Sequence, residues 1–158
     1  GMASGHASIS TMHADSVDTL IRRLQTPPIE LSPTLINSLD CVAIATHALV
    51  DKRETRRLRE VVEIINVNRD GTALVNTPLL WDPKKDIFYS KKQSKVFEKI
   101  SVKHGVTLEK LQKEFITRTK LLYELYKQKV FGFEEVQKVV NDYYKNPVEV
   151  LNKYNLVG

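Results

Sequence analysis

The feature that most constrains the fold is an apolar run from Cys41 to Leu49, interrupted only by Thr46 and His47. The run is much shorter than the roughly 18 apolar residues that a membrane helix requires. Its length and composition are instead typical of a buried β-strand. The chain is therefore expected to build at least part of its core around a sheet.

Two further strands are predicted after this run. Residues 57–67 are rich in valine and isoleucine, and they end at the turn-forming sequence Asn68-Arg69-Asp70-Gly71. A third strand is expected over 72–80, and a short fourth strand over 86–90 follows the break at Trp81-Asp82-Pro83. An antiparallel meander is the simplest topology for residues 41–90.

The pattern changes to helical spacing after Ser90. Helices are expected after Ser94, after Thr107 (about 108–130), after Gly132, and after Asn146, which precedes Pro147 and Glu149 in a strong helix-start pattern. The longest of these helices carries a stripe that we expect to face the core, interrupted by Arg118. The stripe consists of Leu108, Leu111, Phe115, Leu122 and Leu125.

The first 40 residues show a third pattern. Residues 7–12 are small and β-branched, which predicts a short buried strand. A helix is expected next, with Asp15 as its N-cap and its end before Pro27-Pro28. Ser32-Pro33 predicts a second short helix over about 33–39. The fold class is thus α+β, with an N-terminal part over 1–92 and a helical subdomain over 93–158.

Composition excludes several classes of protein. The 158 residues are 42% hydrophobic and 27% charged, as in an ordinary globular chain. The chain has a single cysteine, Cys41, which excludes a disulfide framework and a multi-cysteine zinc site. No residue near Cys41 in the sequence is a candidate for an activating base, so Cys41 is not expected to act as a nucleophile. The N-terminus lacks the pattern of a signal peptide. The expected location is therefore intracellular.

Charge is uneven along the chain, which has a net charge of +5. Five of the eight residues from Lys52 to Arg59 are basic, a density found in nucleic-acid-binding patches. The run contains Glu54, lacks aromatic residues for base stacking and connects two predicted strands. A solvated hairpin tip is the favoured interpretation, and nucleic acid is an unlikely partner.

Two histidines flank the first predicted strand. His6 follows Gly5, and His13 lies in Ser10-Thr11-Met12-His13-Ala14-Asp15, where a strand gives way to a helix. Such strand–helix junctions often host phosphate and nucleotide sites, because the helix N-terminus presents free N–H groups. Ordinary hydrogen bonding of both histidines is the alternative. Arg22 and Arg23 lie on the helix predicted after His13, and an arginine side chain is suited to binding phosphate oxygens. The alternative is a solvent-exposed helix face on which Asp18 and Arg22 form an ion pair.

These residues resemble the histidine box of the secretion-superfamily hexameric ATPases, which drive type II and type IV secretion, type IV pili and the archaeal flagellum. The resemblance covers nearly the whole chain, and its details look like the archaeal branch. Those details are the His-Ala-Asp-Ser ending at residues 13–16, Pro27-Pro28, Leu31-Ser32-Pro33, Trp81-Asp82-Pro83 with Asp86, the Glu114 and Arg118 helix, Phe133-Glu134-Glu135-Val136 and Tyr143-Tyr144.

The resemblance implies specific roles. His13 would sense the γ-phosphate of ATP near a subunit interface, and His6 would support it. Ser10 and Thr11 would lie at the nucleotide-binding site and the subunit interface. Arg23 would lie there too and either contact phosphate or stabilise a RecA-like core. The partners would be the other subunits of a hexamer and an integral-membrane platform protein. The location would be cytoplasmic and peripheral to the membrane.

The resemblance also implies what the chain lacks. The family's P-loop and Walker B segment precede the histidine box, and no P-loop sequence occurs here. The fold is therefore expected to be the C-terminal remnant of a RecA-like core with the meander and helical subdomain. No metal site or cofactor is expected for this chain, whereas ATP and Mg²⁺ are expected in the intact parent. Without the P-loop, the chain alone is expected to be inactive. A stand-alone regulatory or interaction module that docks on such an ATPase, or on its membrane partner, is the alternative.

Overall fold

The computed structural model describes residues 7–156 of the chain. The chain divides into two compact units, residues 1–99 (unit 1) and residues 100–158 (unit 2), and the division falls inside one helix, α3 (Lys95–His104). Unit 1 is mixed α/β and unit 2 is helical. Within residues 7–156, no helix has both the length and the apolar character needed to cross a bilayer.

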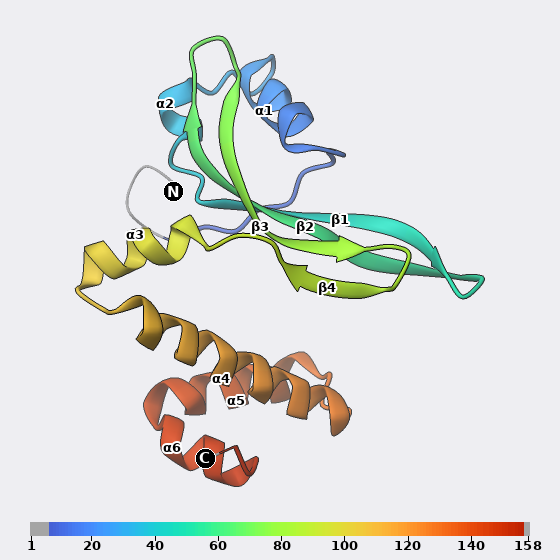
Figure 1. Cartoon of the computed structure of the whole chain (residues 1–158), viewed down its shortest axis with the longest axis vertical. Helices are drawn as coiled ribbons and strands as arrows, with labels where there is room; N and C mark the ends of the chain where they lie inside the picture. Colours follow the sequence, from blue (N-terminus) through green and yellow to red (C-terminus); the bar gives the residue numbers. More distant parts are fainter. Residues whose placement is uncertain (1–6, 157–158) are drawn as a thin grey trace. The chain divides into compact units, whose positions relative to one another are not determined.

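Unit 1 is built on a four-stranded antiparallel sheet in the order β1-β2-β3-β4 (Figure 1). The strands are β1 (Cys41–Val50), β2 (Arg53–Val67), β3 (Ala73–Asp82) and β4 (Ile87–Ser90). The meander predicted from the sequence is therefore confirmed. The turn between β2 and β3 is closed by Asp70, whose side chain accepts hydrogen bonds from the N–H and the hydroxyl of Thr72. Gly71 has a φ of +85°, which glycine adopts without strain.

The basic run begins at the exposed turn of the β1–β2 hairpin, but most of it belongs to strand β2 rather than to the connection between the strands. Strand β2 begins at Arg53, four residues earlier than predicted, because β1 pairs with it as far as Val50. Only Asp51 and Lys52 form the turn, and both have positive φ values, as a tight two-residue hairpin requires. The register between β1 and β2 shifts between Ile44 and Ala45, which marks a bulge.

Two helices pack on the sheet to form the core of unit 1. They are α1 (Val17–Gln25) and α2 (Pro33–Ile36). The cap of α1 is Ser16 rather than the predicted Asp15, because the Ser16 hydroxyl accepts from the Thr19 N–H. Helix α2 is shorter than predicted, since Asn37 accepts a hydrogen bond from the Val67 N–H of β2 instead of extending the helix. The buried cluster consists of Val17, Ile21, Ile36, Ile44, Val62 and Val67.

The buried strand predicted over 7–12 is absent. Residues 7–14 form neither helix nor strand, and the Ile9 side chain is 99% exposed. A β-strand needs a neighbour to satisfy its backbone groups, and no described strand pairs with this segment. The prediction failed because apolar patterning reports the preference for burial but does not supply the partner.

Unit 2 contains α4 (Leu108–Lys127), α5 (Phe133–Lys145) and α6 (Pro147–Lys153), drawn in orange and red in Figure 1. Thr107 caps α4 and Asn146 caps α6, as predicted. Part of the predicted core stripe is wrong, because Phe115 and Leu122 are 49% and 56% exposed. The packing of α5 and α6 selects the adjacent stripe. The buried cluster of unit 2 is Leu121, Leu125, Tyr143, Val150 and Tyr154.

Candidate functional site

The predicted phosphate-sensing residue, His13, lies in the extended segment before α1. Its side chain is exposed, and it makes no hydrogen bond or ion pair within the described residues. Ser10 and Thr11 precede it on the same segment and are also exposed. His6 lies outside the described residues. The segment therefore presents the three described members of the predicted histidine box to solvent, without contacts among their side chains.

The start of α1 is held by hydrogen bonds on both sides of Ser16. The Ser16 hydroxyl accepts from the Thr19 N–H at 3.2 Å. Hydrogen bonds from the hydroxyls of Thr19 and Ser16 lower the pKa of Asp15 and favour its carboxylate. Arg59 of β2 donates from Nη2 to the Asp15 carbonyl oxygen at 2.8 Å, which ties the start of the helix to the sheet. His13 thus lies two residues before an anchored point of the fold.

Arg23 lies in the last turn of α1, at the opposite end of the helix from His13. Its side chain is exposed and makes no ion pair within the described residues, and the predicted Asp18–Arg22 pair is not formed. Arginines in a last turn interact favourably with the helix dipole, which accounts for their place. The fold of this chain alone does not bring Arg23 and His13 into contact.

A buried carboxylate in unit 1 was missed by the sequence analysis. Glu63 of β2 is 3% exposed and accepts from the backbone N–H groups of Lys95 and Val96, at 2.7 and 3.3 Å. It also accepts from the Ser94 hydroxyl and from Asn76, at 2.8 Å for the amide. Glu63 therefore caps α3 from the sheet. The signal in the sequence is a single charged residue within the apolar run Val61-Val62-Glu63-Ile64-Ile65.

The hydrogen bonds to Glu63 also determine its protonation. Burial alone would raise the pKa of this carboxyl group, but the donors Ser94, Asn76, Lys95 and Val96 together lower it. The carboxylate is thereby held ionised, with each donor directed to one of its oxygens. Such a satisfied network is typical of a structural role, because no lone pair is turned toward a ligand.

A second ionic cluster links β2 to the turn between β3 and β4. Arg57 donates from Nε and Nη2 to the two carboxylate oxygens of Asp86, both at 2.8 Å. The indole Nε1 of Trp81 donates to Asp86 Oδ1, also at 2.8 Å. The Arg57 and Trp81 hydrogen bonds lower the pKa of Asp86 to about 2. The cluster therefore holds the turn between β3 and β4 against strand β2.

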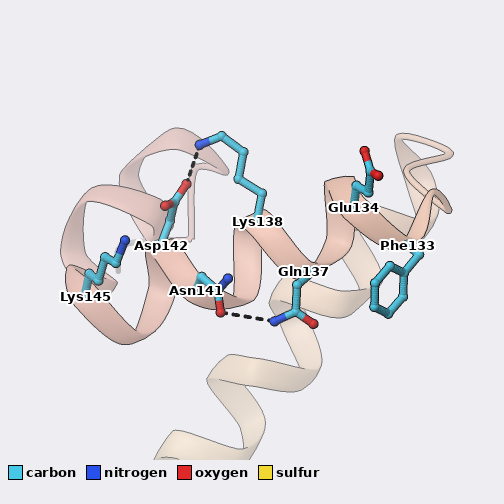
Figure 2. A pocket seen from close by; sticks show the side chains of 7 residues that line it. All are labelled: Phe133, Glu134, Gln137, Lys138, Asn141, Asp142 and Lys145. Carbon is cyan, nitrogen blue, oxygen red and sulfur yellow. Dashed lines mark hydrogen bonds and ion pairs between the residues drawn. The ribbon is translucent and has the colours of Figure 1, made fainter.

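A shallow hollow runs along one side of α5. Figure 2 shows that polar side chains on successive turns of the helix line it, and that they pair with one another. Lys138 contacts Asp142 at 2.9 Å, and Gln137 donates to Asn141 at 3.1 Å. These two pairs bind their polar groups to each other rather than directing them toward a common point in the hollow. Among residues 7–156, no three His, Cys, Asp or Glu side chains are grouped as metal ligands.

The sulfur of Cys41 is kept protonated by its surroundings. Partial burial raises the pKa of the thiol, and the carboxylates of Asp40 and Glu63 raise it further. A protonated thiol is a poor nucleophile. The environment thus disfavours a role for Cys41 in covalent chemistry.

Three proteins of the archaeon Methanocaldococcus jannaschii are similar to this chain. Uncharacterized protein MJ1287 is 25% identical over 90% of the chain, which covers 53% of that protein. Uncharacterized proteins MJ0900 and MJ0781 are each 26% identical, over 95% and 96% of the chain. The chain covers 28% of MJ0900 and 21% of MJ0781. No family model matches the chain.

The lengths of these relatives bear on how the chain is interpreted. The chain spans about half the length of MJ1287 and under a third of the other two. In each relative, a large part of the protein lies outside the matched region. The match therefore covers one region of these proteins and does not show the activity of a whole protein.

Proposed function

We propose that this chain is the C-terminal part of a hexameric motor ATPase of the secretion superfamily. The parent would couple ATP hydrolysis to protein secretion or to assembly of a pilus or archaeal flagellum. The observation that carries the proposal is the histidine-box string from Gly5-His6 to Ser10-Thr11-Met12-His13-Ala14-Asp15-Ser16. The archaeal source of the similar proteins, each longer than the matched region, adds support.

Two features of unit 1 support the view that it continues a larger sheet. The exposed segment 7–14 carries Ile9, an apolar side chain that would be buried if neighbouring strands were supplied. Strand β1 is an edge strand within the described residues, and it contains no Lys, Pro or acidic residue of the kind that blocks pairing at natural edges. A RecA-like sheet formed with an upstream part of the parent would cover both.

The proposal gives each predicted site residue a task in the parent. The P-loop and the Walker B glutamate would come from the upstream part and hold ATP and Mg²⁺. His13 would donate a hydrogen bond to the γ-phosphate end of the nucleotide, supported by His6. Ser10, Thr11 and Arg23 would line the nucleotide and subunit interface. The parent would be cytoplasmic and would dock on an integral-membrane platform protein.

The first test is the DNA sequence upstream of Met2, read in frame. The proposal expects an open frame that encodes a P-loop and a Walker B glutamate. A stop codon and a ribosome-binding site directly before Met2 would contradict it. That result would favour a stand-alone module, which docks on a full-length ATPase or its membrane partner without catalysis.

The second test is ATP hydrolysis by the parent and by this chain. His13→Ala in the parent should lower kcat by roughly 10²-fold, because a group that stabilises transition-state charge is lost. His104→Ala is the matched control, since His104 is an exposed histidine on α3 outside the predicted site. The isolated chain should release no phosphate. Steady phosphate release from the isolated chain, abolished by His13→Ala, would refute the predicted inactivity.

A further inference from the structure

Helix α4 exposes an apolar face in addition to the one that it buries within unit 2. Leu121 and Leu125 are buried against α5 and α6. Phe131 is 65% exposed and extends the second surface past the end of the helix, because its ring lies 6.1 Å from that of Tyr126. The helical members of this surface, which we call the exposed face of α4, are Ile116 (53%), Leu122 (56%), Tyr123 (60%) and Tyr126 (65%).

The exposed face is apolar in its middle and basic at one border. At 100° per residue, the sector of about 120° from Leu122 to Ile116 contains none of the charged residues of α4. Lys127 lies at the border of this sector, with its Nζ 5.3 Å from the centre of the Tyr123 ring. Lys120 lies just beyond Lys127 by the same helical spacing.

The charges of α4 that have no ion-pair partner are mostly positive. The helix carries five basic and three acidic residues. Glu114 pairs with Arg118, and Glu124 pairs with Lys127, so these four charges cancel. Glu109 is then the one acidic residue of α4 without an ion pair within residues 7–156. The basic residues of α4 without one in the same range are Lys110, Lys113 and Lys120. Three positive charges against one negative charge favour an anionic occupant for the face.

A lipid surface matches this face better than an acidic protein surface does. Amphipathic helices that lie in the plane of a membrane combine aromatic and aliphatic side chains on one face with lysines on the polar side. Tyrosine suits that depth, because its ring is apolar while its hydroxyl can stay in water. Lysine stems are long enough for the ammonium groups to reach the lipid phosphates from beside the face. A bilayer also needs no groove to receive the helix, whereas a protein partner would have to supply one.

We propose that unit 2 binds an anionic membrane surface through the exposed face of α4. Leu122 and Tyr123 enter the boundary between headgroups and acyl chains. Lys113 and Lys120 lie beside the lipid phosphates. The buried side of α4, with the two helices that pack on it, faces away from the lipid. The proposal concerns lipid contact by this chain itself and does not rest on the ATPase function.

Sedimentation of the full chain with lipid vesicles tests the proposal. The chain should sediment with vesicles of phosphatidylcholine and phosphatidylglycerol in equal parts, and it should stay in solution with phosphatidylcholine alone. Raising NaCl from about 0.1 to 1 M should weaken binding, because the Debye length falls from about 10 to about 3 Å. No binding at roughly 1 mM anionic lipid, about ten times the concentration at which one myristoyl chain is half-bound, would reject the membrane in favour of an acidic protein surface.

Leu122→Asp tests the apolar part of the contact. It should lower the partition coefficient by about tenfold or more, because a carboxylate would have to enter the acyl boundary. Leu74→Asp is the matched control, since Leu74 is 58% exposed but lies on β3. Helical circular dichroism checks that each variant is folded. Unchanged binding of Leu122→Asp, or an equal loss in Leu74→Asp, would place the contact elsewhere and overturn the proposal.

A double lysine variant tests the basic border. Lys113→Gln with Lys120→Gln should weaken binding to the anionic vesicles by roughly 25-fold, because each lysine near such a surface contributes about fivefold. The control is Lys84→Gln with Lys85→Gln, which removes the same charge from exposed positions between β3 and β4. Equal losses in the two double variants would show that net charge, rather than this face, attracts the vesicles, and would refute the proposal.

An environment-sensitive dye on a single cysteine tests the orientation of α4, in a Cys41→Ser background. The dye at Leu122→Cys should brighten and shift to the blue with anionic vesicles, because it leaves water. Lys110→Cys is the control, since residue 110 is nine positions from Thr119, at the centre of the sector, and so lies about 180° away from it. An equal response at both positions would contradict the proposed orientation.

Discussion

Glu63 and Asp86 have environments that hold them ionised, but by different means. Glu63 is buried in the sheet and receives donors from β3, Ser94 and the first turn of α3. Asp86 is partly exposed and is held by Arg57 and Trp81. Neither network follows from residue type or spacing, because its members come from separate parts of the chain. Both networks have consequences that can be measured, in the free energy of unfolding and in its dependence on pH.

Removing the Glu63 side chain should be costly. Glu63→Ala leaves the N–H groups of Lys95 and Val96 and the amide of Asn76 without an acceptor, so the free energy of unfolding should fall by about 2–4 kcal/mol. Urea unfolding at pH 7, followed by the fluorescence of Trp81, measures the loss. Glu54→Ala, an exposed residue of the same strand, should change stability by less than about 0.5 kcal/mol.

The same residue predicts a pH dependence. Because the pKa of Glu63 is lower in the folded chain than the ordinary value of 4.5, its contribution is complete above that value. It is lost as the pH falls through the lower folded-state pKa. The difference in unfolding free energy between the native chain and Glu63→Gln should therefore shrink in acid. A difference that stays constant from pH 7 to pH 3 would contradict this assignment.

Asp86 offers a spectroscopic test, because Trp81 is the single tryptophan of the chain. The pKa of Asp86 is about 2, below its ordinary value of 3.8, so the Trp81 indole N–H resonance should stay unchanged as the pH falls from 7 to 4. Its shift should move only as the pH approaches 2. Arg57→Gln removes the main cause and should move the transition to higher pH. An unmoved transition would show that Arg57 does not set this pKa.

Helices and strands begin and end at residues whose hydrogen bonds are local. Thr107, Asn146 and Ser32 cap helices as the sequence predicts, and the turn at Asn68–Gly71 joins two strands as predicted. Where the boundary depends on a neighbouring element, the prediction shifts. Strand β2 begins at Arg53 because β1 continues opposite it, and α2 ends early because Asn37 bonds to β2.

The cap of α1 is a test of this distinction. Ser16→Ala should lower the free energy of unfolding of unit 1 by about 1 kcal/mol, because the Thr19 N–H loses its acceptor. Asp15→Ala, at the residue that the sequence predicts as the cap, should cost less. Denaturant unfolding of the two variants, measured side by side, ranks the residues. A larger effect at Asp15 would place the cap one residue earlier.

At the scale of the whole molecule, the chain has two separate buried clusters, one in each unit. The first joins α1 and α2 to the sheet, and the second joins α4, α5 and α6. Each unit thus has the buried apolar side chains that a cooperative fold requires. The positions of these clusters could be approximated from helical and strand periodicity, but the choice of face on α4 could not.

Truncation of Leu121 tests the second cluster. Leu121 is 5% exposed, and Leu121→Ala should lower the free energy of unfolding of unit 2 by about 2–4 kcal/mol through the cavity that it leaves. Helical circular dichroism follows this loss, and Trp81 fluorescence follows unit 1. The matched variant Leu122→Ala, at a half-exposed position, should have a smaller effect. Equal losses at both positions would contradict the packing of α4.

The amino-acid sequence alone predicts the α+β composition, the four antiparallel strands, the caps of α2, α4 and α6, and the place of His13 before a helix, because these features depend mainly on neighbours within a few residues. Tertiary structure decided which stripe of α4 is buried, that Glu63 caps α3, and that residues 7–14 have no strand partner. These outcomes depend on contacts between distant segments, and periodicity does not specify them.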